Sequence, residues 1–390
     1  MANQSGSKST SKKKRGPSPK AASVLQGEDP VATWAEFRKG KSKLRLSGVS
    51  LARARLPGID LSDTTLAGAN LSGADLSGAD LSGADLRRAD LTEANLTGAT
   101  LRGARLSRAV LRRAILDGAD LSETNMRPTE LTDPTLGNPG GADLSGARCH
   151  KTRFVKAEMS GCNLEELEAV DACFDGATLR SVALHGARLR GGTFHKALLD
   201  RSSVRKSTLE DVDLSGAQLE HAELRDATFL RCRLHGASTA RSQFHGCTLR
   251  ECQFHEATMT ASLFFSCDLQ RSEFTAATLS QAYLSDNLSG ADFTGADLRR
   301  ALIPNSTLCG ATFVKADLRG ADLGRSELSR VDLTGADLRN TGLVMTTLRD
   351  AELTSARHGP RTQWPSQLSA REIERRTSVR DDVGIEASQV

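Results

Sequence analysis

Residues 69–101 read ANLSGADLSGADLSGADLRRADLTEANLTGATL. Leucine recurs at every fifth position of this stretch, and an alanine stands two residues before each leucine. Beyond the stretch, the same spacing continues through three blocks that span Leu46–Leu136, Leu144–Leu284 and Leu288–Leu353. The blocks contain 62 units, and 59 of the central positions are Leu, Phe, Met, Ile or Val. The three exceptions are Cys149, Ala169 and Thr239. The repeat therefore covers most of the chain and decides its fold.

A period of five residues fits neither of the regular secondary structures. An α-helix would turn its apolar residues by about 140° at each repeat, and a strand would alternate them between two faces. A coil that turns a corner every five residues removes the conflict. The central residue and the residue two before it (position i−2) then point inward, and positions i−1, i+1 and i+2 point outward. Four units make a turn of 20 residues, and successive turns stack as parallel ladders about 4.8 Å apart.

The A-(D/N)-L-(S/T)-G unit resembles that of the pentapeptide repeat family, and the resemblance covers about 310 of the 390 residues. It implies an all-β fold, a right-handed quadrilateral parallel β-helix. At four units per coil, the 62 units predict about 15 coils and a rod roughly 75 Å long. The resemblance implies little about function, because members of this family act on different targets.

The repeat divides the chain into three parts. We expect residues 1–43 to be a disordered basic tail with a short capping helix at 29–40, and 44–355 to be the β-helix. Residues 356–390 should form a C-terminal cap, with a charged helix near 367–378, and a charged tail. The block boundaries predict register breaks at 137–143, where three residues are added, and at 285–288, where one is missing. The candidate end caps are Trp34, Phe37 and Trp364.

The sequence offers little for catalysis, cofactors or metals. It contains no nucleotide-binding, hydrolase or zinc-protease motif in a fitting context, and a packed rod lacks a wide concavity. Outward histidines such as His235 and His255 are expected to form a solvated ladder, with a metal site as the alternative. Cysteines at inward positions, among them Cys232 and Cys252, are expected to be buried reduced thiols, although stacked neighbours lie within disulfide range.

Two groups of outward residues are candidates for binding. The first is a ladder of aspartates at i−1 beside arginines at i+1, which either neutralise each other or form a comb for an anionic partner. The ladder consists of Asp297, Arg299, Asp317, Arg319, Asp337 and Arg339. The second is an apolar patch at positions that the repeat usually fills with small or polar residues. The patch consists of Leu263, Phe265, Tyr283 and Leu302. It predicts a protein-binding or homodimer surface, unless the missing residue near 286 tucks it away.

Three functions fit these features, and the leading one is a non-enzymatic protein-interaction scaffold with a protein partner of unknown identity. Some members of the resembled family mimic duplex DNA and shield gyrase from quinolones, which makes regulation of a type II topoisomerase the second hypothesis. Residues 45–353 hold 36 Lys/Arg and 40 Asp/Glu, a net −4 that is weak for a mimic of DNA. An exported effector that docks a host protein is the third.

The location and the remaining partners follow from the terminal sequence and the hydropathy. The chain has no apolar run long enough to span a membrane and no signal-peptide pattern at its start, so we expect a cytoplasmic protein. Binding of nucleic acid is expected only weakly, through the basic residues of segment 1–20.

Overall fold

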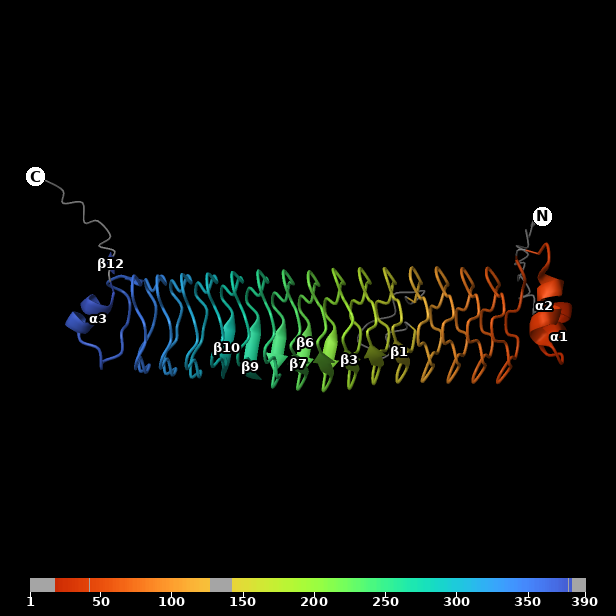
Figure 1. The fold of residues 1–390 in the computed structure, drawn as a ribbon, viewed down its shortest axis with the longest axis horizontal. Coiled ribbons are helices and arrows are strands. Elements are labelled where there is room, and N and C mark those ends of the chain that lie inside the picture. The colour runs from red at the N-terminus through yellow and green to blue at the C-terminus, as the bar shows by residue number, and fades with distance from the viewer. Residues whose placement is uncertain (1–17, 42, 127–141, 378, 381–390) are drawn as a thin grey trace, which may run out of the picture.

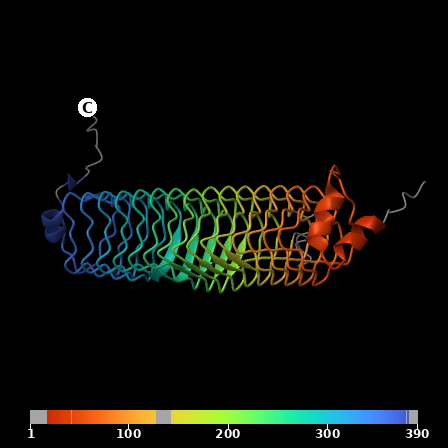
Figure 2. The ribbon, with the colours of Figure 1, turned by 45° about the vertical axis from the view of Figure 1, so that its right-hand side comes forward.

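The computed structural model describes residues 18–41, 43–126, 142–377 and 379–380. These residues form a long rod of stacked coils with helices at both ends (Figures 1 and 2). Parallel bridges join residues that are mostly twenty apart, and one column runs through fifteen successive bridges from Arg45 to Arg357. The quadrilateral parallel β-helix of about 15 coils is therefore confirmed.

Each unit makes the same small set of backbone hydrogen bonds. The amide of Leu71 donates to the carbonyl of Asp90 in the next coil at 2.7 Å, and that of Asp75 donates to Ala54 in the preceding coil at 2.9 Å. Within the corner, the amide of Ala74 donates to the carbonyl of Leu71 at 3.0 Å. The central and i−2 side chains are buried as predicted, since Leu71 and Ala74 are both fully enclosed. Backbone pairing between coils thus continues on every side of the rod.

The rod has four sides, which we number in the order in which the chain passes them. Side 1 is the bridge column from Arg45 to Arg357, and side 2 is the column from Ser50 to Gln363. Side 3 runs from Arg55 to Thr347 and side 4 from Asp60 to Glu352. The outward residues of one side therefore form straight columns along the rod.

On sides 2 and 3 the bridges lengthen into two five-stranded parallel sheets. Side 3 carries β1 (Arg148–His150), β2 (Glu168–Val170), β3 (Arg188–Arg190), β5 (Thr208–Glu210) and β7 (Thr228–Leu230). Side 2 carries β4 (Ser203–Arg205), β6 (Glu223–Arg225), β8 (Gln243–His245), β9 (Leu263–Asp268) and β10 (Tyr283–Asn287). The remaining pair is β11 (Arg357–His358) with β12 (Val379–Arg380).

The N-terminal end of the rod is covered by two helices, α1 (Pro19–Leu25) and α2 (Pro30–Arg38). In α2, Trp34 is fully buried and its indole N–H donates to the carbonyl of Asp60 at 2.6 Å. The predicted capping helix thus lies on the first coils. The expectation that the whole of residues 1–28 is disordered is wrong for α1, because this helix buries Ala21 and Leu25 against the core. The open first coil supplies the apolar surface that orders it.

The C-terminal end carries α3 (Ala370–Arg376), which lies within the segment predicted to be helical. Before it, the half-buried Trp364 packs against the core, and its ring meets that of His358 at 5.6 Å in an edge-on arrangement. Trp364 therefore lies against the core at the C-terminal end of the rod.

The pairing of the flanking residues shows two shifts of register, and the first is larger than the three residues that the sequence predicts. Val110 pairs with Asp143, thirty-three residues on, whereas an insertion of three would separate partners by twenty-three. Residues 127–141, which include most of the predicted break and the units of Leu131 and Leu136, lie outside the described residues. At the second break, Asp268 pairs with Asn287, nineteen residues on, and the register shifts between Ser285 and Asn287. The second break therefore removes one residue from a coil and leaves the rod continuous.

Stacked phenylalanines run inside side 4, at the central positions of their units. The rings of Phe154, Phe174 and Phe194 stack at 4.6 and 4.5 Å. A second run joins Phe254, Phe274, Phe293 and Phe313 at 4.8 to 4.9 Å. The stack from Phe274 to Phe293 crosses the shortened coil without a gap, so the missing residue does not disturb this part of the core.

Candidate protein-interaction surface

The predicted apolar patch is contiguous on side 2 of the rod. Leu263, Phe265 and Leu302 are 41%, 50% and 46% exposed, and Tyr283 is half-buried. Tyr283 bridges Leu263 on one neighbouring coil and Leu302 on the other, so the three form one column. Phe265 lies beside this column, and its ring is 6.0 Å from that of His245. The four residues thus form a continuous surface, which we call the side-2 patch.

Two further exposed apolar residues, which the sequence did not single out, lie near the C-terminal end of side 2. Val344 and Met345 are 47% and 65% exposed, and they occupy the i+1 and i+2 positions of their unit. The signal was present in the sequence, because the same position count that selected Phe265 also places Val344 outward. The exposed apolar surface of side 2 therefore extends past the patch.

The surface of side 2 changes character at the patch. On the N-terminal side of the patch, the i+1 column consists of the long side chains of Arg205, Arg225 and His245. On the C-terminal side, the corresponding positions are Pro304 and Gly324. The i+1 column thus carries long side chains before Tyr283, where the surface is raised, and short ones after it, where the surface is lower.

A buried carboxylate lies beneath the patch, in the shortened corner. Asp286 stands at i−2, an inward position that Ala, Ser or Cys fills in most coils, and it is buried. Its Oδ1 accepts a hydrogen bond from the amide of Cys267 at 2.7 Å, and its own amide donates to the hydroxyl of Ser306. Among the described residues, Oδ2 has no hydrogen-bond partner. Burial raises the pKa of Asp286 to about 7, against the opposing effect of the Cys267 hydrogen bond.

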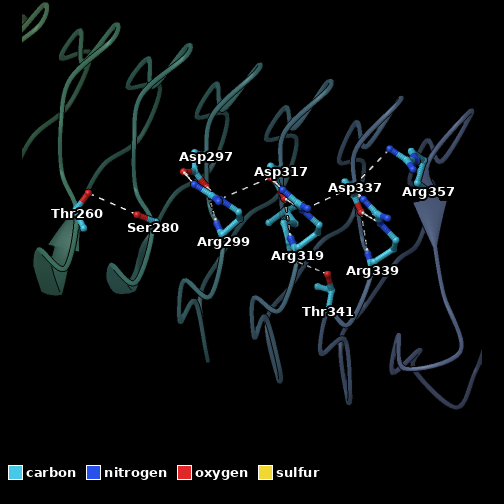
Figure 3. Close-up of polar contacts among 11 residues, drawn as sticks. Thr260, Ser280, Asp297, Arg299, Asp317, Arg319, Asp337, Arg339, Thr341 and Arg357 are labelled. Atoms are coloured by element: carbon cyan, nitrogen blue, oxygen red, sulfur yellow. Dashed lines mark hydrogen bonds and ion pairs between the residues drawn. The ribbon is translucent and has the colours of Figure 1, made fainter. Parts of the chain in front are cut away.

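The aspartate–arginine ladder neutralises itself. Figure 3 shows three aspartates of side 1 on successive coils, each hydrogen-bonded by the arginine two residues later. The guanidinium of Arg319 donates to both carboxylate oxygens of Asp317 at 2.9 and 2.6 Å. Its Nε also lies 3.8 Å from Asp337 on the next coil. Arg299 and Arg339 make the same paired contacts, and the Arg299 hydrogen bond holds the pKa of Asp297 below its usual value. The donors of the ladder are therefore already engaged, which favours the first of its two readings.

Several outward histidines lie within 4 Å of a carboxylate, namely His185, His195, His235 and His255. Nδ1 and Nε2 of His195 each lie 3.3 Å from an oxygen of Asp175 and Asp213, respectively. Burial lowers the pKa of His195, but these two contacts outweigh it and raise the pKa above its usual value. The rings of His235 and His255 are 6.1 Å apart. Within the described residues, no cluster of three or more His, Cys, Asp or Glu is arranged to hold a metal ion.

The cysteines at i−2 positions behave as small inward residues, whereas Cys173 and Cys309 stand at outward positions and are half-buried. All eight are free, and Cys232 and Cys252 each donate through sulfur to a carbonyl of the preceding coil at 3.4 Å. Ser202 makes the equivalent bond through its hydroxyl at 2.9 Å. Burial raises the pKa of the Cys162 thiol to about 12, so this thiol stays protonated and unreactive at neutral pH.

An open groove of about 1080 Å³ lies along the corner between sides 2 and 3. Glycines at Gly146 and Gly186 leave it open, and long charged side chains border it. Some of these bordering side chains form ion pairs with each other, since Arg113 lies 3.7 Å from Glu93 and Arg188 lies 3.2 Å from Glu168. The groove is therefore a gap between ion pairs along the surface. In the part of the chain that the structure describes, no helix is long and apolar enough to cross a membrane.

Comparisons with known proteins agree with the repeat. The model of the pentapeptide repeats matches eight stretches, which together span 45–127, 142–238 and 326–357. The model of the pentapeptide repeat region matches residues 237–313. No curated protein matches the chain.

Solved structures of similar proteins include several with the same repeat. HetL, a pentapeptide repeat protein involved in heterocyst differentiation regulation in the cyanobacterium Nostoc, is 27% identical; the match covers 68% of this chain and 88% of HetL, with a TM-score of 0.20. QnrB1, a plasmid-mediated fluoroquinolone resistance protein, is 19% identical over 53% of this chain and 87% of its own, with a TM-score of 0.28. A pentapeptide repeat protein of the Arabidopsis thaliana thylakoid lumen is 32% identical over 26% of this chain and 74% of its own, with a TM-score of 0.19.

Proposed function

This chain belongs to the pentapeptide repeat family, and from that premise we propose that it is a non-enzymatic protein-interaction scaffold. The observation that carries the proposal is the side-2 patch, where Leu263, Phe265 and Leu302 are each 41% to 50% exposed on a rod whose other outward residues are mostly polar. Contiguous exposed apolar surface of this kind marks sites of protein association.

The backbone of the rod supports binding with a small entropic cost. Residues of the patch are fixed by bridges on both neighbouring coils, so Leu263, Tyr283 and Leu302 hold their spacing before a partner arrives. A surface that is already ordered loses little conformational freedom on binding. Phe265 adds an aromatic side chain, the type that contributes most at protein interfaces.

The alternative function as a mimic of DNA finds less support in the surface charges. Duplex DNA carries one negative charge per about 1.7 Å, so a mimic needs carboxylates that remain unneutralised. On side 1 the aspartates that could supply such a row are each bound by an arginine, as in the pair Asp317 and Arg319. We therefore expect no effect of the purified chain on gyrase supercoiling, with or without a quinolone.

Affinity capture from the cells that produce the protein tests the proposal. The bait is the full chain, compared with a variant in which Leu263, Phe265 and Tyr283 are changed to Ser. A matched control changes three outward, half-buried apolar residues on other sides to Ser, namely Val155, Leu198 and Leu230. We expect the wild-type and control baits to retain the same protein and the patch variant to lose it. Retention of the same proteins by all three baits would contradict the assignment of the patch.

A further inference from the structure

The side-2 patch is symmetric along the rod. Tyr283 lies at its centre, with Leu263 one coil before it and Leu302 one coil after it. A two-fold axis that crosses the rod at Tyr283, within the plane of side 2, reverses the direction of the rod and turns the side to face its own image. Such an axis places Leu302 opposite Leu263 of a second copy, and Tyr283 opposite itself. The order Leu, Tyr, Leu is thus self-complementary in an antiparallel pair.

We propose that the partner of the side-2 patch is a second copy of this chain, packed side 2 against side 2 in antiparallel orientation. The inference rests on the proposed function, since it names the partner of the same surface. Around the patch, the axis also brings Phe265 opposite Pro304 of the second copy. Three kinds of apolar pair, five pairs in all by the two-fold symmetry, therefore lie at the centre of the contact, where burial from water contributes most.

The shape of side 2 selects the antiparallel orientation over the parallel one. The long side chains of Arg225 and His245 precede the patch, whereas Gly324 and Gly342 follow it. In the antiparallel pair, the raised part of one rod meets the low part of the other, with His245 opposite Gly324. In a parallel pair, raised parts would meet each other and the low parts would be left apart, so the two sides could not touch along their length.

The polar residues next to the patch are also matched in this arrangement. Gln243, two coils before Tyr283, comes opposite Asp322, two coils after it. An amide can donate to a carboxylate, so this pair can form a hydrogen bond on each side of the axis. Arg225 comes opposite the exposed Val344, where the aliphatic stem of the arginine can cover apolar surface. The arrangement thus also covers one of the two exposed apolar residues near the C-terminal end of side 2.

The length of the overlap indicates how strong the dimer is. With the axis at Tyr283, side 2 overlaps over the nine coils from Ser203 to Gln363. Nine coils extend about 40 Å and a three-residue side is about 10 Å wide, so each rod contributes a projected area of roughly 400 Å². Stable interfaces bury roughly 800 Å² per partner. We therefore expect a dimer in concentration-dependent equilibrium with the monomer.

The first test is the mass of the purified full-length protein by sedimentation. The average mass should rise with concentration from the 41.6 kDa of one chain toward twice that value. Leu302→Ser should raise the dissociation constant at least tenfold, whereas the matched control Leu198→Ser on side 1 should leave it unchanged. A wild-type chain that stays monomeric at the highest soluble concentration overturns the proposal, as does equal loss of dimer in both variants.

The second test is cysteine cross-linking, which reports the orientation. In a background in which the half-buried Cys173 and Cys309 are changed to Ser, Tyr283→Cys should cross-link to itself on mild oxidation. Leu263→Cys should cross-link to Leu302→Cys when the two variants are mixed, and at least tenfold less in either alone. Cross-linking of Leu263→Cys to Phe265→Cys in place of Leu302→Cys would show a parallel pair and overturn the antiparallel arrangement.

The two proposals fail in different ways. Patch-dependent capture of another protein by a chain that is monomeric in sedimentation contradicts the dimer and leaves the scaffold function standing. Patch-dependent capture of the chain itself supports both. A dimer that forms normally from the variant lacking Leu263, Phe265 and Tyr283 contradicts the side-2 dimer, and the scaffold function is then decided by the capture experiment alone.

Discussion

The coils of residues 69–101 and those of residues 263–305 follow the same backbone plan, but they differ in what they place outside and at one corner. In the first region, the outward residues are small or polar and glycines such as Gly78 turn the corners with positive φ. In the second, Leu263, Phe265 and Leu302 are exposed and one corner has lost a residue. The backbone ladder survives both changes. The inward positions therefore determine the fold, and the outward positions can vary with function.

Substitutions at two leucines test the difference between inward and outward positions most directly. Leu81 is fully buried in the regular region, and Leu302 is 46% exposed in the other. Leu81→Ala should lower the free energy of unfolding by about 2–5 kcal/mol, because it removes buried methyl groups and leaves a cavity. Leu302→Ala should change it by less than about 0.5 kcal/mol. Urea unfolding at a concentration where the chain is monomeric measures both, and similar losses would refute the division into inward and outward positions.

The inward positions could be read from the sequence because a five-residue period has one geometric solution that buries all its apolar residues. The same count places Phe293 and Phe313 in one column with Phe254 and Phe274, and their rings stack across the shortened coil. It also brought Leu263, Tyr283 and Leu302 into one column, since outward columns follow from the same register.

Other features depend on interactions that periodicity does not encode. The ladder passes from Val110 to Asp143, a step of thirty-three residues where a regular coil takes twenty, and the five-residue spacing alone does not predict the length of this step. The order of α1 comes from the apolar end of the rod, which exists only once the coils have stacked. The register of the repeat places Asp286 at an inward position. The pKa of its buried carboxyl group, however, depends on the hydrogen-bond partners that the corner provides, and periodicity does not encode these partners.

Asp286 should make the stability of the second region depend on pH. The regular region of residues 69–101 has only alanines at the equivalent positions and lacks this dependence. The pKa of Asp286 is raised from 3.8 to about 7 in the folded chain, so folding favours the protonated form. Between these pH values the unfolded carboxyl is ionised while the folded one holds its proton, and stability from this group falls as the pH rises. Above pH 7 the loss is complete. Three pKa units set an upper limit of about 4 kcal/mol, and relaxation of the corner should reduce this to about 2 kcal/mol.

Asp286→Ser should therefore stabilise the chain at pH 8 and leave its stability at pH 4 nearly unchanged. A serine at this position has a precedent one coil later, where Ser306 donates to the carbonyl of Leu284 at 2.9 Å. Urea midpoints across pH 4–9 measure the effect. The control is Asp292→Ser, an outward aspartate of the same region that is half-buried at the surface. Parallel pH profiles for the wild type and the Asp286 variant would contradict the buried, raised carboxyl.

The smallest expected effect comes from the outward charges of side 1, which lie on the regular plan but carry no apolar surface. Arg319 is bound to Asp317 through two hydrogen bonds and faces Asp337 at 3.8 Å, yet its side chain is 44% exposed. Exposed ion pairs contribute about 0–1 kcal/mol, and salt screens them. Arg319→Gln should therefore lower the free energy of unfolding by about 0.5 kcal/mol at low ionic strength, and by less in 1 M salt. The variant should leave the mass of the protein in sedimentation unchanged, because side 1 lies outside the proposed contact. A shift toward monomer on this substitution would mean that the charged ladder, and not the side-2 patch, holds the two copies together.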